Sequence, residues 1–202
     1  MIGILDYGLG NINSFTNIIR DLNVESKLVK NLSDFDDCSH FILPGVGAFD
    51  NAMQKIRSKN FEKTIKFQVL EKKKPLLGIC VGMQILGSSS AEGVEKGLNL
   101  IDGKIKKVKT NNDQKLPHMG WNRIIKIKEN KILNKISEKN EFYFLHSYYF
   151  ESSNEEDIVA TTFYSNNFPV IVNRGKIYGI QFHPEKSHEL GRKIIENFTQ
   201  IF

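Results

Sequence analysis

The sequence has few cysteines: Cys38 and Cys80 are the only two among 202 residues. Two thiols are too few for a disulfide framework, which argues against a small secreted fold held together by disulfides. A single reactive thiol in a reducing compartment is compatible with this count. Cys38 follows Asp36 and Asp37, and because acidic neighbours raise the pKa of a thiol, we expect Cys38 to be structural.

Long hydrophobic runs are also absent. No apolar segment approaches the roughly 20 residues that a membrane-spanning helix needs. The N-terminus has no basic region and reaches Asp6 after a short apolar run, which is typical of a first core strand rather than of a signal peptide. We therefore expect a cytoplasmic protein.

Nucleic-acid-binding motifs are missing, although the formal net charge is +5. No helix-turn-helix, zinc-ligand or RNA-binding pattern is present, and the lysines of residues 104–109 alternate with apolar residues as in an exposed strand. A solvated surface explains this charge better than a nucleic-acid partner does. A basic surface also suits a phosphorylated substrate or an acidic protein partner.

The N-terminal half alternates apolar strands with amphipathic helices. The strand patterns cover residues 2–5, 26–30 and 40–43 and the apolar run before Cys80, and helical spacing recurs over residues 12–22, 52–56 and 61–70. This alternation predicts a mostly parallel sheet covered on both faces, with the active site at the carboxyl ends of the strands. The glycine-rich turn at residues 6–11 could bind a dinucleotide, but it lacks the third glycine of G-x-G-x-x-G, so we favour a plain connection.

The pattern changes after Gly97 to short alternating strands. They cover residues 104–109, 122–128, 142–146, 158–164, 170–173 and 177–182. A last amphipathic helix runs from Leu190 to Phe198, and no repeat, low-complexity tract or linker divides the chain. We expect one α/β domain over residues 1–202, a three-layer sandwich with a mostly parallel central sheet and additional antiparallel strands in the C-terminal half.

A nucleophile-elbow pattern lies in the segment GICVGMQ at residues 78–84. Glycines two residues before and two residues after Cys80 leave room for a sharp, strained strand-to-helix turn. A helix N-terminus at this point would favour the thiolate over the thiol. The pattern predicts that Cys80 is a nucleophile, although a buried cysteine between two packing glycines would give the same motif.

A candidate base and its orienting acid occur in His183-Pro184-Glu185, at the end of the last predicted strand. Residues two apart in an extended backbone project to the same side, and Pro184 disfavours a helical conformation at His183. Glu185 would then orient the imidazole while His183 takes the thiol proton. Alone, the tripeptide also fits a strand-end histidine beside a surface glutamate, but its occurrence with the elbow favours a triad.

These two motifs resemble those of the class I (triad) glutamine amidotransferases. The segments PHMGWN at residues 117–122 and FLHSYY at residues 144–149 are similar to the glutaminase subunits of imidazole glycerol phosphate synthases, the HisH family. The likeness covers nearly the whole chain in order, with mild departures at Val81 and Leu145. It implies hydrolysis of glutamine to glutamate and ammonia through a Cys80 thioester, and we expect no metal and no cofactor.

The resemblance also assigns positions around the triad of Cys80, His183 and Glu185. The implied oxyanion donors are in Gly45, Val46, Gly47 and Val81. The implied glutamine-binding residues are Gln84, Glu92, His146, Ser147 and Tyr148. Glu92 could instead be a solvated acid in a loop.

A partner is implied as well: a cyclase subunit of (β/α)8 form, HisF-like, which receives the ammonia in a heterodimer of histidine biosynthesis. The implied interface positions are Asn11, Trp121, Tyr143 and Lys186, although by composition a lone tryptophan is more often a core residue. No nucleic acid or membrane is expected as a partner. Two alternatives stay open. One is a paralogous amidotransferase that supplies ammonia to a different synthase, such as a surface-sugar amidination enzyme, and the other is a catalytically silent binding subunit.

Overall fold

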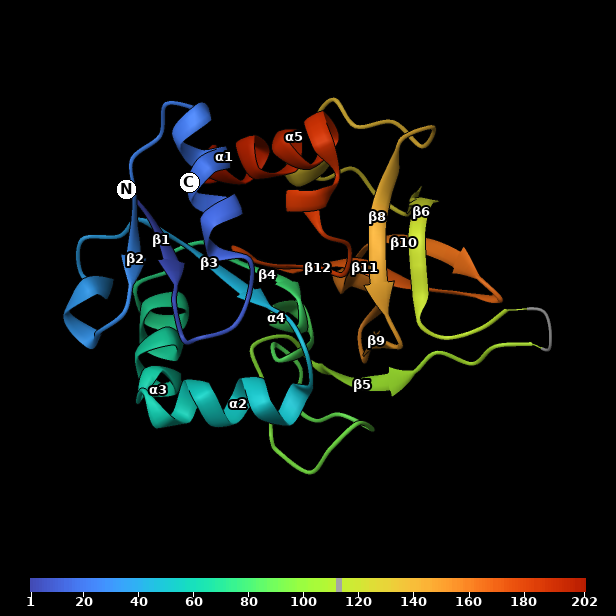
Figure 1. The fold of residues 1–202 in the computed structure, drawn as a ribbon, viewed down its shortest axis with the longest axis horizontal. Helices are drawn as coiled ribbons and strands as arrows, with labels where there is room; N and C mark the ends of the chain where they lie inside the picture. The colour runs from blue at the N-terminus through green and yellow to red at the C-terminus, as the bar shows by residue number, and fades with distance from the viewer. Residues whose placement is uncertain (112–113) are drawn as a thin grey trace.

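The fold is built on one eight-stranded mixed sheet in the computed structural model, which describes residues 1–111 and 114–202 (Figure 1). Its strands are β1 (Ile2–Leu5), β2 (Ser26–Val29), β3 (His40–Gly45), β4 (Leu76–Cys80), β7 (Ile125–Lys126), β10 (Ile158–Tyr164), β11 (Asn166–Arg174) and β12 (Ile177–Ile180). Their order across the sheet is β2-β1-β3-β4-β12-β11-β10-β7. The first five in this order are parallel, and β11, β10 and β7 continue the sheet with antiparallel pairing.

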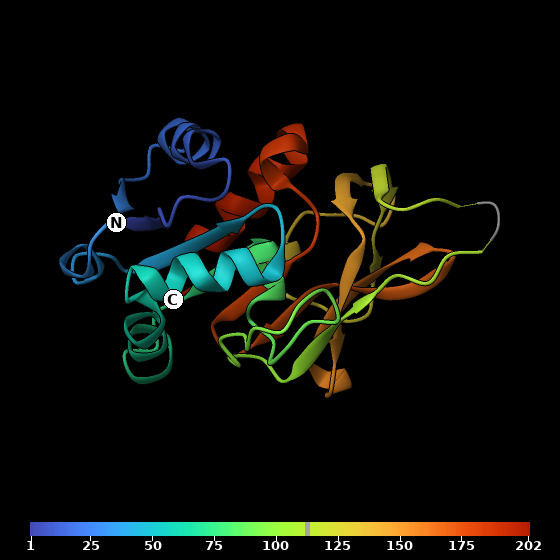
Figure 2. The same cartoon turned by 60° about the horizontal axis from the view of Figure 1, so that its bottom comes forward.

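Helices cover both faces of this sheet, which confirms the α/β architecture expected from the sequence. One face carries α1 (Ile12–Asp21) and α5 (His188–Thr199), and the other carries α2 (Phe49–Ser58), α3 (Phe61–Lys66) and the π-helical η2 (Phe67–Glu71) (Figures 1 and 2). The shorter helical segments are α4 (Val81–Gln84), η1 (Leu32–Phe35), η3 (Lys131–Leu133), η4 (Glu155–Asp157) and η5 (Pro184–Lys186). Within the described ranges, no helix combines the length and apolar character that crossing a bilayer requires.

The central parallel strands are apolar on both sides because helices cover both. Every residue of β1, β3 and β4 is buried, which explains why these strands are continuous apolar runs in the sequence. Parallel strands end at the same edge of a sheet. Leu5, Gly45 and Cys80 therefore bring the segments that follow them to one edge, where a ligand site is expected in such folds.

Two antiparallel ribbons extend the C-terminal half beyond the main sheet. One pairs β5 (Gly103–Lys107) with β9 (Tyr148–Ser152), and the other pairs β6 (His118–Arg123) with β8 (Glu141–His146). The strand expected over residues 158–164 is present with those bounds as β10. The expected antiparallel character of this half is confirmed.

One strand prediction in this half is wrong, and one strand was not predicted. The strand expected over residues 122–128 is instead β6, which begins at His118, followed by the short β7. Pro117 and Gly120 indicate a loop locally, but continuous pairing with β8 from His118 onward outweighs that preference. No sequence signal indicated β9, because only Ser147 separates it from β8 and the chain changes sheets without a turn motif.

Candidate active site

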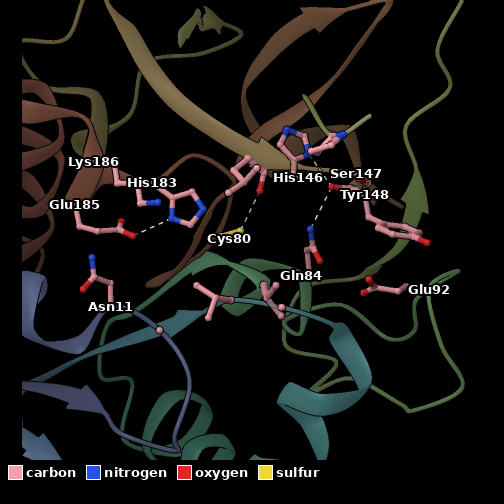
Figure 3. A pocket seen from close by; sticks show the side chains of 16 residues that line it. Asn11, Cys80, Gln84, Glu92, His146, Ser147, Tyr148, His183, Glu185 and Lys186 are labelled. Carbon is pink, nitrogen blue, oxygen red and sulfur yellow. Dashed lines mark hydrogen bonds and ion pairs between the residues drawn. The ribbon is translucent and has the colours of Figure 1, made fainter. Parts of the chain in front are cut away.

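A cavity of about 590 Å³ lies at the carboxyl edge of the parallel strands (Figure 3). All of the predicted site residues line it except Gly45, Trp121 and Tyr143. Figure 3 shows His183 and Glu185 at one side of Cys80, with Gln84 and Glu92 at the other. Residues from distant parts of the sequence therefore share one cavity.

Cys80 has the strained backbone expected of a nucleophile elbow. It is the last residue of β4, with φ 54° and ψ −113°, a region that residues with side chains rarely adopt. A Cβ atom on Gly82 would lie 1.9 Å from the carbonyl oxygen of Leu43, and one on Gly78 would lie 2.5 Å from the carbonyl oxygen of Gly82. Both flanking positions therefore require glycine because backbone segments meet there.

The helix after the elbow is much shorter than the helical pattern suggested. α4 has only four residues, so it gives Cys80 a single turn of helix rather than a long dipole. Activation of the sulfur therefore depends mainly on the side chains that surround it.

His183 and Glu185 form a buried ion pair beside Cys80. The Nδ1 atom of His183 lies 2.8 Å from Oε1 of Glu185, and the two side chains are 5% and 2% exposed. The local backbone differs from the expected strand, because β12 ends at Ile180 and residues 184–186 form the 3-10 turn η5. Pro184 begins this turn, and its fixed φ suits the first position of a helical turn. The turn still brings Glu185 back to the imidazole.

The ionisation of His183 is set by two opposing effects. Burial alone would lower the pKa of His183, but hydrogen bonding and negative charge at Cys80 and Glu185 raise it to about 10. A histidine with this pKa holds its proton at neutral pH when the sulfur is a thiolate. The two neighbouring groups therefore stabilise the protonated imidazole, as a histidine that takes the proton of a cysteine nucleophile requires.

The sulfur of Cys80 has two further polar neighbours. Its thiol donates to the carbonyl oxygen of Leu145, 3.9 Å away, and Nε2 of Gln181 donates to the sulfur from 3.7 Å. Gln181 was not among the predicted site residues. The signal that could have found it is a single glutamine inside the apolar run of residues 177–182, since a buried amide in a core strand needs specific partners.

A hydrogen-bond network extends from Tyr148 through two buried histidines. Nδ1 of His146 lies 2.8 Å from the carbonyl oxygen of Tyr148, and Nε2 of His146 lies 2.9 Å from Nδ1 of His118. The amide of Asn122 lies 3.1 Å from Nε2 of His118. Both ring nitrogens of His146 are thus occupied within the protein, so this residue lines the cavity without a free ring nitrogen for a bound molecule.

Burial keeps both of these histidines neutral. It lowers the pKa of His118 to about 4 and that of His146 to about 3. A carbonyl oxygen can only accept, so His146 carries its proton on Nδ1 and accepts from Nδ1 of His118. The direction of each hydrogen bond in the network follows from that one acceptor.

The predicted oxyanion segment, residues 45–47, lies directly against the elbow. A Cβ atom on Gly45 would lie 2.4 Å from the backbone nitrogen of Gly82, so the oxyanion segment and the elbow pack through their backbones. Gly47 has φ +84° with open space around it, and Val46 is 39% exposed at the cavity. Val46 and Gly47 therefore line the same cavity as Cys80.

Glu92 is anchored rather than loosely solvated. Although the residue is exposed, its carboxylate accepts a hydrogen bond of 2.9 Å from the backbone N–H of Phe49, the first residue of α2. Asp50 in turn accepts hydrogen bonds from the backbone N–H groups of Val94 and Glu95, at 2.9 and 3.0 Å. These bonds hold the loop that carries Glu92 against α2.

The predicted interface residues form two groups at the rim of the cavity. Trp121 is 47% exposed, which excludes the alternative that it is a core residue, and it lies opposite Tyr143 in the β6–β8 ribbon. The Nζ atom of Lys186 lies 5.4 Å from the centre of the Tyr143 ring. Asn11 lines the cavity from the other side, and its side chain makes no capping bond to α1.

The glycine-rich turn before Asn11 does not fit the dinucleotide alternative. A Cβ atom on Gly10 would lie 2.6 Å from Cβ of Pro44, so this turn packs against the end of β3 instead of leaving space for a pyrophosphate. Among the residues that the structure describes, no group of three or more histidine, cysteine, aspartate or glutamate side chains is placed to hold a metal ion.

Comparisons with known proteins identify the family of the chain. The family pattern described as "Glutamine amidotransferase class-I" matches residues 3–201. The chain is 45% identical to imidazole glycerol phosphate synthase subunit HisH of Leptospira interrogans and 40% identical to subunit HisH 2 of Pseudomonas aeruginosa, with 100% of each chain covered. It is 38% identical to subunit HisH 1 of Campylobacter jejuni, again with 100% of each chain covered.

Solved structures resemble the fold at lower sequence identity. A crystal structure described as a glutamine amidotransferase has a TM-score of 0.76 at 19% identity and covers 98% of both chains. A glutamine amidotransferase of Thermotoga maritima has a TM-score of 0.67 at 19% identity, covering 98% of this chain and 81% of that one. These structures support the three-layer arrangement.

Proposed function

Since the chain belongs to the class I glutamine amidotransferase family, we propose that it is the glutaminase subunit of an imidazole glycerol phosphate synthase. It hydrolyses L-glutamine to glutamate and ammonia and passes the ammonia to a cyclase subunit of (β/α)8 form in a heterodimer. The observation that carries this proposal is the buried His183–Glu185 pair beside the strained Cys80, in a cavity large enough for an amino acid. The full-length likeness to HisH subunits favours it over a paralogue with another acceptor.

The proposed reaction begins with proton transfer from Cys80 to His183. Because Nδ1 of His183 is held by Glu185, Nε2 is the nitrogen that takes the thiol proton. The thiolate attacks the carboxamide carbon of glutamine, and the C–N bond then breaks as Nε2 returns the proton to the leaving nitrogen. Ammonia departs and a thioester remains. A water molecule, deprotonated by His183, hydrolyses the thioester to glutamate and restores the thiol.

Negative charge on the tetrahedral oxygen needs fixed donors. The backbone N–H of Val81 and those of the oxyanion segment would supply them, each worth about 3 kcal/mol of transition-state stabilisation, because this segment packs against the elbow and Val46 and Gly47 line the cavity. Gly47 has a positive φ and open space around it, so the peptide groups of this segment have room to rotate.

The other end of the cavity would hold the α-amino and α-carboxylate groups of glutamine. Glu92 supplies a carboxylate for the ammonium group, and its position is fixed by the bond to Phe49. Ser147 and Tyr148 line the same side and would offer donors for the carboxylate. The NH2 group of Gln84 already donates to Tyr148 and Gln181, so Gln84 would offer its side-chain oxygen to the ammonium group. His146 would act by positioning Tyr148, since both of its ring nitrogens are already used.

The cyclase would dock over the open rim of the cavity. Trp121, Tyr143 and Lys186 form a connected aromatic and cationic patch there, with Asn11 across the opening. Aromatic residues that are half exposed on a rigid ribbon are typical anchors of protein interfaces. Docking at this rim would place the site of ammonia release against the partner.

The test is to purify this chain with the histidine-pathway cyclase from the same genome and to measure glutamate release and imidazole glycerol phosphate formation. We expect a one-to-one complex in which glutamine supports synthesis. A complex that releases glutamate but forms imidazole glycerol phosphate only from added ammonia, and not from glutamine, would favour the paralogue that serves another synthase. Absence of glutamate release with every partner would favour a silent binding subunit.

A further inference from the structure

Gln181 is a buried amide to which the proposed reaction gives no role. It follows β12 directly, its exposed fraction is 0%, and its backbone N–H donates to the carbonyl oxygen of Val170 at 2.9 Å. Burying an amide is unfavourable unless its polar atoms are paired. Its side chain reaches Cys80 at one end and Gln84 at the other.

The orientation of this amide follows from a chain of contacts that ends on a backbone carbonyl. The backbone carbonyl oxygen of Tyr148 can only accept, so the atom of Gln84 that lies 3.1 Å from it must be the NH2 group. The same NH2 group lies 3.1 Å from Gln181, which must therefore present its oxygen there. Gln181 consequently turns its own NH2 group toward the sulfur, 3.7 Å away.

The carbonyl that starts this chain is itself held in place. Tyr148 accepts a second hydrogen bond at its carbonyl oxygen from Nδ1 of His146, at 2.8 Å. His146 is backed by His118, so the acceptor is fixed from the side of the β6–β8 ribbon. Reversing the Gln181 amide would leave two donors facing each other at Gln84 and an oxygen facing the sulfur.

We propose that Gln181 is a catalytic residue, which donates an Nε2–H hydrogen bond to the sulfur of Cys80 and stabilises the thiolate. This inference rests on the proposed glutaminase function, in which the thiolate is the nucleophile. On the other side of the sulfur, the carbonyl oxygen of Leu145 can interact favourably only with the thiol. The donor at Gln181 offsets that preference once the proton has moved to His183.

Among the ionisable groups described around the sulfur, only His183 can carry a positive charge at neutral pH. His183 and Glu185 approach from the segment after β12, Tyr7 from the segment after β1, and His146 from the end of β8. Burial and the charge of Cys80 raise the pKa of Tyr7, and burial lowers the pKa of His146, so both stay neutral at pH 7. The charge of the thiolate is thus compensated by His183 and by the neutral donor at Gln181.

The test is the pH dependence of Cys80 alkylation by iodoacetamide, measured at the level of the labelled peptide in the chain by itself. Gln181→Met keeps the length of the side chain but removes the donor, and Gln181→Glu places an acceptor there. We expect the apparent pKa of Cys80 to rise by about 0.5–1 unit in Gln181→Met, which slows labelling by about three- to tenfold at pH values below that pKa. Gln181→Glu should raise the apparent pKa of Cys80 further.

Cys38 provides an internal control for folding, because it is buried in the core and, unlike Cys80, does not line the cavity, so it should be labelled only if the chain unfolds. Gln84→Met leaves Gln181 in place but frees its amide to turn, so it should give a smaller rise and keeps the test valid if Gln181 variants unfold. Alkylation profiles of folded variants that coincide with that of the wild type would overturn the proposal. Failure of the proposed function is a separate result, seen as absence of glutamate release by the wild-type complex.

Discussion

The carboxylate of Glu92 accepts a hydrogen bond from the backbone N–H of Phe49, 2.9 Å away and 43 residues earlier in the chain. In the same first turn of α2, Asp50 accepts from the backbone N–H groups of Val94 and Glu95. Helix α2 and the loop around Glu92 therefore satisfy each other's unpaired backbone donors. Helix α2 follows the oxyanion segment almost directly. These hydrogen bonds therefore connect Glu92, which is proposed to bind the substrate glutamine, to the oxyanion segment.

Asp50→Ala should weaken glutamine binding without removing any group that touches the substrate. Loss of two hydrogen bonds to a carboxylate frees the loop, and we expect KM for glutamine to rise about tenfold while kcat changes less. Steady-state glutamate release by the cyclase complex measures both constants. Gln54→Ala, which removes a surface contact between α2 and Glu95, is the matched control and should leave KM near the wild-type value.

Cys80→Ala should abolish glutaminase activity while leaving the fold and partner binding intact. No other group in the cavity can form the thioester, whereas ammonia supplied from solution should still support synthesis by the cyclase. Glutamate release and ammonia-dependent synthesis are measured on the same complex. Glutamine hydrolysis near the wild-type rate in this variant would contradict the assignment of the nucleophile.

Cys80→Gly should be more stable than Cys80→Ala, although both lack the thiol. The backbone at this position has φ 54° and ψ −113°, which is strained for alanine but readily adopted by glycine. We expect a difference of about 1–2 kcal/mol in the free energy of unfolding, measured with urea. Equal stabilities would mean that the elbow stores no strain.

Glu185→Gln should lower kcat/KM for glutamine by about a hundredfold, a smaller loss than in Cys80→Ala. Glutamine keeps the shape of the side chain but removes the charge that helps to raise the pKa of His183 to about 10. The imidazolium is lost as pH rises through that pKa, so the alkaline limb of the pH profile should move to lower pH. A variant as inactive as Cys80→Ala would give Glu185 a more direct part in the reaction.

Acid should destabilise the protein through His118 and His146. Their pKa values in the folded protein, about 4 and about 3, lie below the ordinary value near 6.5, so the unfolded chain binds protons first. Their stabilisation is complete above pH 6.5 and declines as pH falls, by about 2 kcal/mol for each at pH 5.

Urea unfolding at pH 7 and pH 5 measures this loss. His118→Gln removes one titrating ring and should reduce the difference between the two pH values. His183 acts in the opposite direction: its raised pKa stabilises the folded protein fully at low pH, and this stabilisation is already partly lost at pH 7, so it reduces the measured difference slightly. If the difference in unfolding free energy between pH 7 and pH 5 is the same in His118→Gln as in the wild type, His118 is not the group that titrates.

Much of the fold could be predicted because the relevant signals are local. The apolar runs of β1 and β3 and the amphipathic spacing of α1 follow from burial on two faces or on one. The elbow could be predicted for the same reason, because Gly78 is needed by a backbone contact within the sharp turn at Cys80, although Gly82 is needed by the carbonyl of Leu43 in the neighbouring strand. The His-Pro-Glu motif placed two side chains together, although by a 3-10 turn rather than by a strand.

Local sequence accounts for the alternation of strands and helices, for the elbow and for the motifs of the proposed triad. Tertiary packing alone places Gln181 against the sulfur, His118 behind His146 and Glu92 at the start of α2. Each of these contacts joins residues 28 to 101 positions apart, and it exists because strand register and helix packing bring their backbones together. A hydrogen bond of this kind leaves no periodic or local trace in the chain, so it becomes visible only once the layers are assembled.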